Sequence, residues 1–217
     1  KQMEGEPWFH LAALAIDKDD LDAFRQIRRD MLGHFGSGRF PTPSAYTAFL
    51  CAAMPAEPSE LDSGLQLAER VVAQEFKIGR PGNDSISTSG MIGQTSHDLS
   101  VVSCAWCEYR KGQFAKAIET LEEVRSSEAY LRSIAIRGEE AIHLCGDLAF
   151  VVSQHQLGEK SAALEALSLA RQTMSKWDEN YPGTVKRESD GRWPIWMIAK
   201  ALLREAEALI GESQGAW

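Results

Sequence analysis

Apolar side chains recur at every third or fourth position along most of the chain, which is the spacing of one face of an α-helix. The segment 19–35 is typical, and the apolar residues of its predicted inner face are Leu21, Phe24, Ile27, Met31 and Leu32. No stretch shows the strict alternation of apolar and polar residues, rich in β-branched side chains, that a strand needs. The pattern therefore predicts an all-α fold.

Glycine, proline and small polar residues mark where the predicted helices begin and end. Thr42 is a predicted N-cap, and Pro43 is predicted in the first turn of the helix that follows. Two polar stretches interrupt the pattern at 79–96 and 179–193, and we expect 79–96 to be either a long flexible loop or an ordered excursion. The predicted helices are 7–17, 19–35, 43–54, 59–76, 97–111, 113–126, 134–157, 160–177 and 194–210.

Two segments, YRKGQFAKAIETL and HQLGEKSAALEAL, share one arrangement of small residues. In each, a helix ends at a glycine, Gly112 or Gly158, and an alanine follows five positions later, at Ala117 or Ala163. Glycine lets the chain reverse tightly at a helix end, and alanine lets two antiparallel helices approach closely. These segments therefore predict two α-hairpins.

Two further pairs fit this arrangement more loosely. The first pair places Ala23 in the small position without a glycine at the turn, and the second fits through Gly64 and Ala68 with a longer connection. The spacing from Gly112 to Gly158 is 46 residues, whereas a regular tetratricopeptide repeat has about 34. We therefore expect irregular repeats with long helices or insertions.

The glycine at the turn and the small residue on the second helix resemble the tetratricopeptide repeat. The resemblance implies an all-α, right-handed α-α superhelix, a TPR-like solenoid of about four antiparallel helix pairs within a single domain, 1–217. The implied pairs are 7–36, 42–76, 97–126 and 134–177, and a closing helix follows at 194–210.

The order of the segments has a second resemblance, to the repeat regions that follow the kinase domain in many bacterial, planctomycete-type serine/threonine protein kinases. The segments that carry it are WFHLAALAIDKDDLDAFRQIRRDMLGHFG, AFLCAAMP, LQLAERVVA, AWCEYRKGQFAKAIETLEE, HQLGEKSAALEALSLA and PIWMIAKALLREAEALI. The sequence contains no glycine-rich loop, HRD or DFG motif of a kinase. The resemblance implies a non-catalytic segment, with an attached kinase domain as a possible partner in a parent chain.

The net charge and the N-terminal residues limit which partners and which cellular location we expect. The chain has 23 Lys and Arg against 31 Asp and Glu, a net charge of −8, without a long basic block, which argues against nucleic acid and against an anionic membrane surface. It contains neither an apolar run of about 20 residues nor a secretion-signal core. We expect a cytoplasmic location. Because the sequence starts at Lys1, we also expect a piece of a longer polypeptide, and a membrane segment upstream would place it outside the cytoplasm.

Residue types that carry chemistry are present without the spacing that chemistry needs. Cys104 and Cys107 have the spacing of a redox or metal pair, but they lie in the middle of a predicted helix and no second pair accompanies them. We therefore interpret both, like Cys51 and Cys145, as buried packing residues. The five histidines are dispersed, there is no GxSxG motif, and the acidic runs 57–60 and 119–123 are interpreted as solvated helix faces. The prediction is no enzyme, with no catalytic, cofactor or metal site.

A stack of helix pairs predicts an extended inner groove, which the first helix of each pair lines. By resemblance to the repeat family, the predicted groove residues are Val102, Trp106, Tyr109, Arg110, Val152, His155 and Gln156. Trp, Tyr and Arg are enriched where proteins bind one another. This indicates a scaffold that binds a protein or peptide segment, with Arg110 pairing with acidic groups of the ligand.

Three alternatives stay open. Trp106 and Tyr109 can instead pack against the next helix pair. The array can also be the regulatory or spacer arm of a serine/threonine kinase or another signalling enzyme, without a partner of its own. A groove site for a metal or small molecule, using His155 or Cys107, is the third alternative. The sequence leaves homodimerisation open.

Overall fold

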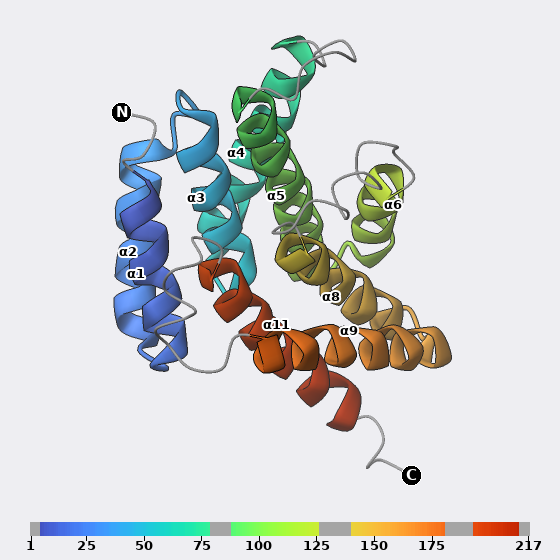
Figure 1. The fold of residues 1–217 in the computed structure, drawn as a ribbon. Helices are drawn as coiled ribbons and strands as arrows, with labels where there is room; N and C mark the ends of the chain where they lie inside the picture. The colour runs from blue at the N-terminus through green and yellow to red at the C-terminus, as the bar shows by residue number, and fades with distance from the viewer. Residues whose placement is uncertain (1–4, 79–87, 126–139, 181–192, 213–217) are drawn as a thin grey trace.

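The computed structural model describes residues 5–78, 88–125, 140–180 and 193–212, and their regular structure is entirely helical (Figure 1). This confirms the all-α prediction. The helices are α1 Glu6–Asp17, α2 Leu21–Phe35, α3 Pro41–Ala53, α4 Pro58–Ile78, α5 Thr88–Arg110, α6 Phe114–Arg125, α8 Glu140–Gln156, α9 Lys160–Asn180 and α11 Trp193–Glu212.

Two of the predicted helix starts are wrong. Helix α3 begins at Pro41, after the extended residue Phe40, so Thr42 is not its N-cap. The Thr42 hydroxyl instead lies 3.1 Å from the Ser96 hydroxyl. Helix α5 begins at Thr88, so the second part of the predicted loop 79–96 is helical. Small polar residues tolerate a helix when its other end is packed, and tertiary contacts override weak local preference. The first part of that loop, 79–87, lies outside the described residues, as do 126–139 and 181–192.

The hairpin turns have a common backbone geometry. Gly112 and Gly158 adopt positive φ angles of 76° and 87°, as the turn prediction requires. In each turn the glycine amide donates to the carbonyl three residues earlier, and the next amide donates to the carbonyl five residues before it. The turn between α1 and α2 has the same two bonds, with Asp19 at a φ of 57°. The first hairpin therefore uses the predicted turn without a glycine, because Asp tolerates the left-handed conformation.

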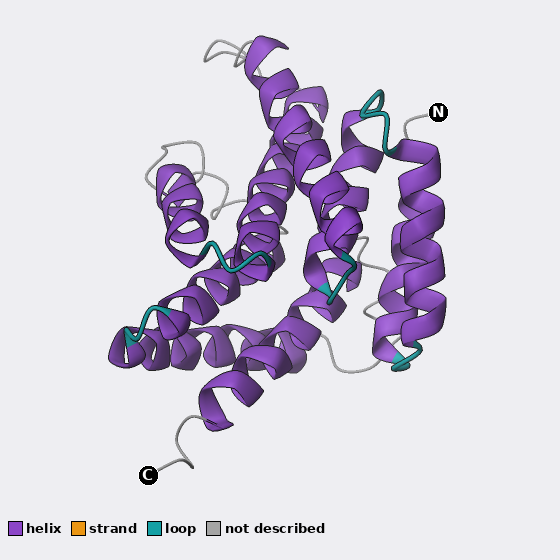
Figure 2. Ribbon diagram, turned by 180° about the vertical axis from the view of Figure 1, so that it is seen from behind, coloured by secondary structure: helices purple, strands orange, loops and turns teal. Residues whose placement is uncertain are grey.

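The helix pairs pack against one another in chain order. In each case the first helix of a pair contacts both helices of the preceding pair: α3 contacts α1 and α2, α5 contacts α3 and α4, and α8 contacts α5 and α6. Helix α11 contacts α8 and α9 in the same way, and it also reaches α1 (Figures 1 and 2). The first and last described helices are therefore in contact.

Small residues allow this close packing. Ala68, Ala117 and Ala163 are completely buried, as the hairpin pattern predicts. Gly64 has a different role from the turn glycines, because it lies inside α4. A Cβ atom at Gly64 would lie 2.6 Å from the Cys51 Cβ on α3. Gly64 therefore lets α4 approach α3 closely near the C-terminal end of α3.

One acidic run is not the solvated face that the sequence predicts. Glu60 is buried at the first turn of α4 and forms an ion pair with Arg28, a fully buried side chain of α2. Glu60 also accepts a hydrogen bond of 3.2 Å from the amide of Glu57. A carboxylate at this position stabilises a helix N-terminus, because it satisfies an amide that has no partner within the helix. The local charge run therefore contains a buried tertiary contact.

Candidate protein-binding surface

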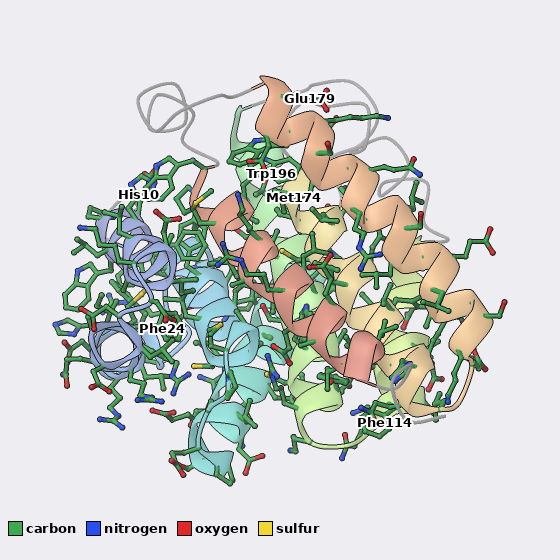
Figure 3. All side chains as sticks on the ribbon, turned by 90° about the horizontal axis from the view of Figure 1, so that it is seen from below. His10, Phe24, Phe114, Met174, Glu179 and Trp196 are labelled. Carbon is green, nitrogen blue, oxygen red and sulfur yellow. The ribbon has the colours of Figure 1, made fainter. Side chains whose placement is uncertain are left out.

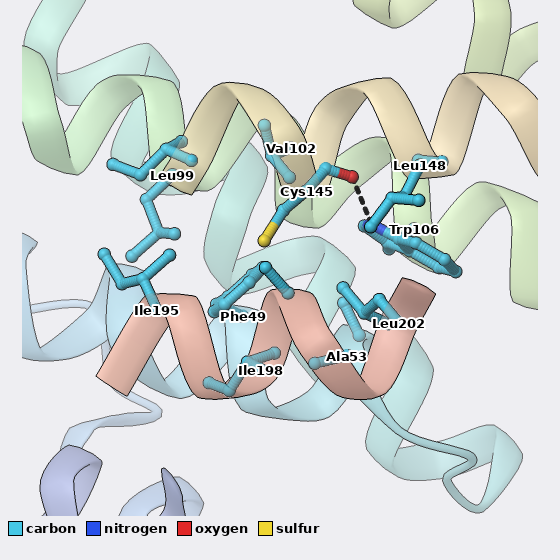
Figure 4. Close-up of a cluster of buried hydrophobic side chains, with 14 of the residues drawn as sticks. Phe49, Ala53, Leu99, Val102, Trp106, Cys145, Leu148, Ile195, Ile198 and Leu202 are labelled. Carbon is cyan, nitrogen blue, oxygen red and sulfur yellow. Dashed lines mark hydrogen bonds between the residues drawn. The ribbon is translucent and has the colours of Figure 1, made fainter. Parts of the chain in front are cut away.

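Helix α11 packs against the helices that carry the predicted groove residues, α5 and α8 (Figure 4). Its residues Ile195, Ile198 and Leu202 lie in one buried cluster with side chains of α3, α5 and α8. We call the part of this cluster outside α11 the inner wall, defined by Phe49, Ala53, Leu99, Val102, Trp106, Cys145 and Leu148. The inner wall therefore already holds a helix of the same chain.

The predicted groove residues fall into two groups. The first group is buried and contains Val102, Trp106, Tyr109 and Val152. The most exposed of the four is Tyr109, at 8%. Arg110 and His155 are half-buried, and Gln156 is exposed. The structure brings Trp106, Tyr109 and Arg110 together with Gln156, and Val102 lies further along the same wall. That these residues bind a partner stays a prediction.

Trp106 joins two successive helix pairs. Its ring is fully buried, and the indole Nε1 donates a hydrogen bond of 2.9 Å to the backbone carbonyl of Cys145 on α8. The ring of Tyr109 meets it edge-on, with 5.5 Å between the ring centroids and an interplanar angle of 88°. Edge-to-face pairs of this kind add to the free energy of packing. Trp106 thus packs against the next helix pair, which is the alternative to a groove-facing position that the sequence left open.

Arg110 is the polar centre of the surface. Its guanidinium carbon lies 5.2 Å from the centre of the Trp106 ring and 5.7 Å from that of Tyr109. The guanidinium also donates to the carbonyl oxygens of Ala52 and Ala53, at the C-terminal end of α3. These contacts restrict the rotation of the guanidinium, because two rings and two carbonyls hold it in addition to its carboxylate partner.

The carboxylate that Arg110 binds belongs to α11. Both oxygens of Glu205 accept hydrogen bonds from the Arg110 guanidinium, in a two-pronged ion pair. Such paired bonds are stronger and more directional than a single charged bond. The sequence prediction placed Arg110 opposite an acidic ligand group, and the structure supplies Glu205 in that place. Sequence reasoning missed Glu205 because the two residues are 95 positions apart.

The charges of Arg110 and Glu205 affect the pKa of Tyr109. Burial raises the pKa of its hydroxyl, the carboxylate of Glu205 raises it further, and Arg110 together with a hydrogen bond to Gln156 opposes these effects. The Tyr109 hydroxyl is therefore neutral at physiological pH, and the ion pair beside it is formed by Arg110 and Glu205.

The four cysteines are buried side chains without a disulfide. Burial raises the pKa of Cys51 and of Cys104 to about 12, and it raises the pKa of Cys107 and Cys145 as well. A thiol with a raised pKa stays protonated and unreactive at neutral pH. This confirms the interpretation of these residues as packing side chains.

Across the described ranges, no three His, Cys, Asp or Glu side chains come together in a way that suits a metal ion. Among the described helices, none combines the length and the apolar character that crossing a bilayer requires. Comparisons with protein families, curated proteins and solved structures found no match to the chain.

Proposed function

We propose that this chain is a TPR-like, right-handed helical repeat that acts as a non-catalytic protein-interaction scaffold and binds a helical segment of another protein on its inner wall. The observation that carries the proposal is the ion pair between Arg110 and Glu205. This pair supports the proposal because, within the chain, an amphipathic helix lies on the wall and presents a carboxylate to the Arg110 guanidinium. Binding of an amphipathic helix in an apolar groove is a recurrent mode of protein recognition.

The packing of the helix pairs supports the repeat part of the proposal. Each first helix contacts both helices of the pair before it, and three of the turns share one backbone geometry. In a repeat stack of this kind the first helices line one side and create an extended surface. The described first helices α3, α5 and α8 supply the inner wall, as that arrangement requires.

A capture experiment with the full chain tests the proposal. Proteins from the source cell that bind the immobilised Glu205→Gln chain, whose α11 no longer forms the ion pair with Arg110, should be recovered about tenfold less when that chain also carries Arg110→Glu, because a charged hydrogen-bonded contact contributes about 1.5–3 kcal/mol. The matched control is Arg171→Glu, which removes the same charge from an exposed arginine that also contacts α11, through Glu207. Thermal unfolding of each variant verifies that it is folded. Equal recovery by the Glu205→Gln chain with and without Arg110→Glu would contradict binding at this wall.

The filled wall also favours a second function. A helical arm that only spaces or regulates an attached signalling enzyme needs no open groove, and in this chain α11 occupies the inner wall. For such an arm we expect that no captured protein distinguishes Arg110→Glu from Arg171→Glu. An attached kinase domain in the parent gene, together with that result, would favour the arm over the scaffold.

A further inference from the structure

We infer that the C-terminal half of α11, residues 202–212, is a built-in competitor that occupies the inner wall until an acidic amphipathic helix from a partner displaces it. The inference rests on the proposed function, and it adds the chemistry of the partner and the regulation of the site. Its basis is the different way in which the two halves of α11 are held.

The first half of α11 belongs to the permanent core. The residues 193–199 are all buried, on every side of the helix. Trp193 lies beside His10 of α1, with 5.5 Å between the ring centroids, and Trp196 stacks on Trp177 of α9 at 4.9 Å. Trp196 of α11 and Met174 of α9, both labelled in Figure 3, belong to the same buried core. Removing this half would open the core, so it stays in place when a partner binds.

The second half of α11 is amphipathic and its outer side faces solvent. Leu202, Ala206 and Ile210 are buried at intervals of four residues, whereas Arg204 and Ala208 are exposed. Glu205 retains 24% of its side-chain exposure in the ion pair with Arg110, so water and a competing carboxylate can reach it. A second polar contact of this half, between Glu207 and Arg171, lies at the surface, where ion pairs contribute little.

The partner must reproduce what this half presents to the wall. It needs apolar residues at three positions four residues apart, and a carboxylate one residue before the middle position. Arg110 selects the carboxylate, because its guanidinium is already oriented by Trp106, Tyr109 and the carbonyls of α3. A basic residue at this position would face the guanidinium and would be repelled. The occupant is therefore an acidic amphipathic helix.

A peptide competition experiment with the full chain tests the displacement. The probe is a fluorescent peptide of residues 200–212, KALLREAEALIGE, and its binding is followed by fluorescence anisotropy. Glu205→Arg in the chain places a cation against Arg110 and should release the second half. We expect it to bind the probe at least tenfold more tightly than the wild-type chain does. The same probe carrying Glu205→Arg should bind the Arg110→Glu chain and fail to bind the Glu205→Arg chain.

The doubly substituted chain, Arg110→Glu with Glu205→Arg, is the matched control, because it restores opposite charges and should close the wall again. Thermal unfolding verifies folding, and Glu205→Gln replaces Glu205→Arg if the latter unfolds, with an effect in the same direction. Equal affinity of the probe for the wild-type and released chains would overturn the competitor role while leaving binding at the wall intact. Absence of binding to every folded chain would overturn both the competitor role and the proposed function.

Discussion

Arg28 and Arg110 make nearly the same set of contacts in two parts of the molecule. Each guanidinium lies over an aromatic ring of its own helix, Phe24 or Trp106, and each binds one glutamate. Each also donates to backbone carbonyls at or just after the end of α3, which are Pro55 for Arg28 and Ala52 and Ala53 for Arg110.

The two pairs differ in burial and in what they join. The Arg28 side chain is 2% exposed and its partner Glu60 is 11% exposed, whereas the values for Arg110 and Glu205 are 11% and 24%. The first pair joins α2 to α4, which belong to successive helix pairs. The second joins α5 to α11, which lies much further along the chain. A buried charge cannot lose its partner without a large cost, but a partly exposed charge can be compensated by water or by another carboxylate. We therefore interpret the Arg28–Glu60 ion pair as permanent and the Arg110–Glu205 ion pair as exchangeable.

The largest effect is expected at the permanent pair. Glu60→Ala leaves the Arg28 guanidinium buried without a counterion, so the free energy of unfolding should fall by about 3–5 kcal/mol. Urea unfolding of the purified chain measures this change. Glu57→Ala, at an exposed residue three positions earlier, is the control and should change the free energy by less than about 0.5 kcal/mol. A loss below about 1 kcal/mol at Glu60 would remove the distinction between the two pairs.

A smaller effect is expected at the exchangeable pair. Glu205→Ala should lower the free energy of unfolding by about 1.5–3 kcal/mol, because the pair is partly solvated in the folded state. The loss should diminish in 1 M salt, which screens partly exposed charges more strongly than buried ones. Urea unfolding at low and high salt, with Glu207→Ala as control, checks this. A loss that does not depend on salt would indicate that the Arg110–Glu205 pair is as permanent as the Arg28–Glu60 pair.

A titrating neighbour of each pair provides a third comparison. Burial raises the pKa of Cys51 to about 12, with Arg28 lowering it and Glu60 raising it. Because an unfolded thiol titrates near its ordinary value of 9.0, the associated stability is complete below pH 9 and is lost as the pH rises toward 12.

At pH 10 this loss should amount to about 1.4 kcal/mol for each buried thiol. Tyr109, beside Arg110, adds a further loss only above pH 10, because its pKa is also raised in the folded state. Urea unfolding at pH 8 and pH 10 measures the difference in the free energy of unfolding. Cys51→Ala should reduce this difference by the amount that one buried thiol contributes. A stability that is the same at both pH values would contradict burial of the thiols.

The smallest effect concerns a turn that touches neither pair and gives a baseline for the others. Asp19→Gly should raise the free energy of unfolding by about 0.5–1 kcal/mol, because Asp19 has a positive φ that glycine adopts without strain. Gly158→Ala should lower it by about 1 kcal/mol for the converse reason, since nothing lies within 4 Å of the added methyl group. Thermal unfolding detects both changes. Effects of the same sign would mean that φ does not govern these turns.

Much of the helical architecture could be read from local patterns. Helical spacing of apolar residues predicted the helices, and the glycine-then-alanine pattern predicted two hairpins whose turn glycines have positive φ. Cysteines in the middle of a helix, without a second pair, predicted burial. These features depend on residues within a few turns of one another, so they are visible in the sequence.

Other features depended on residues far apart in the chain. Nothing local distinguishes Glu60 from the other acids of its run, and its burial follows from Arg28 on another hairpin. The turn at Asp19 lacked its glycine signal, and the start of α5 was hidden by small polar residues.

Local sequence alone therefore determined that the chain forms helices and where most of them reverse, because helix periodicity and turn chemistry act over a few residues. Only the tertiary structure decided that α11 lies on the inner wall and that Glu205 is the carboxylate which Arg110 binds. The physical reason is that an amphipathic helix presents the same apolar face to any matching surface, and only the packing of the whole chain selects which surface it covers.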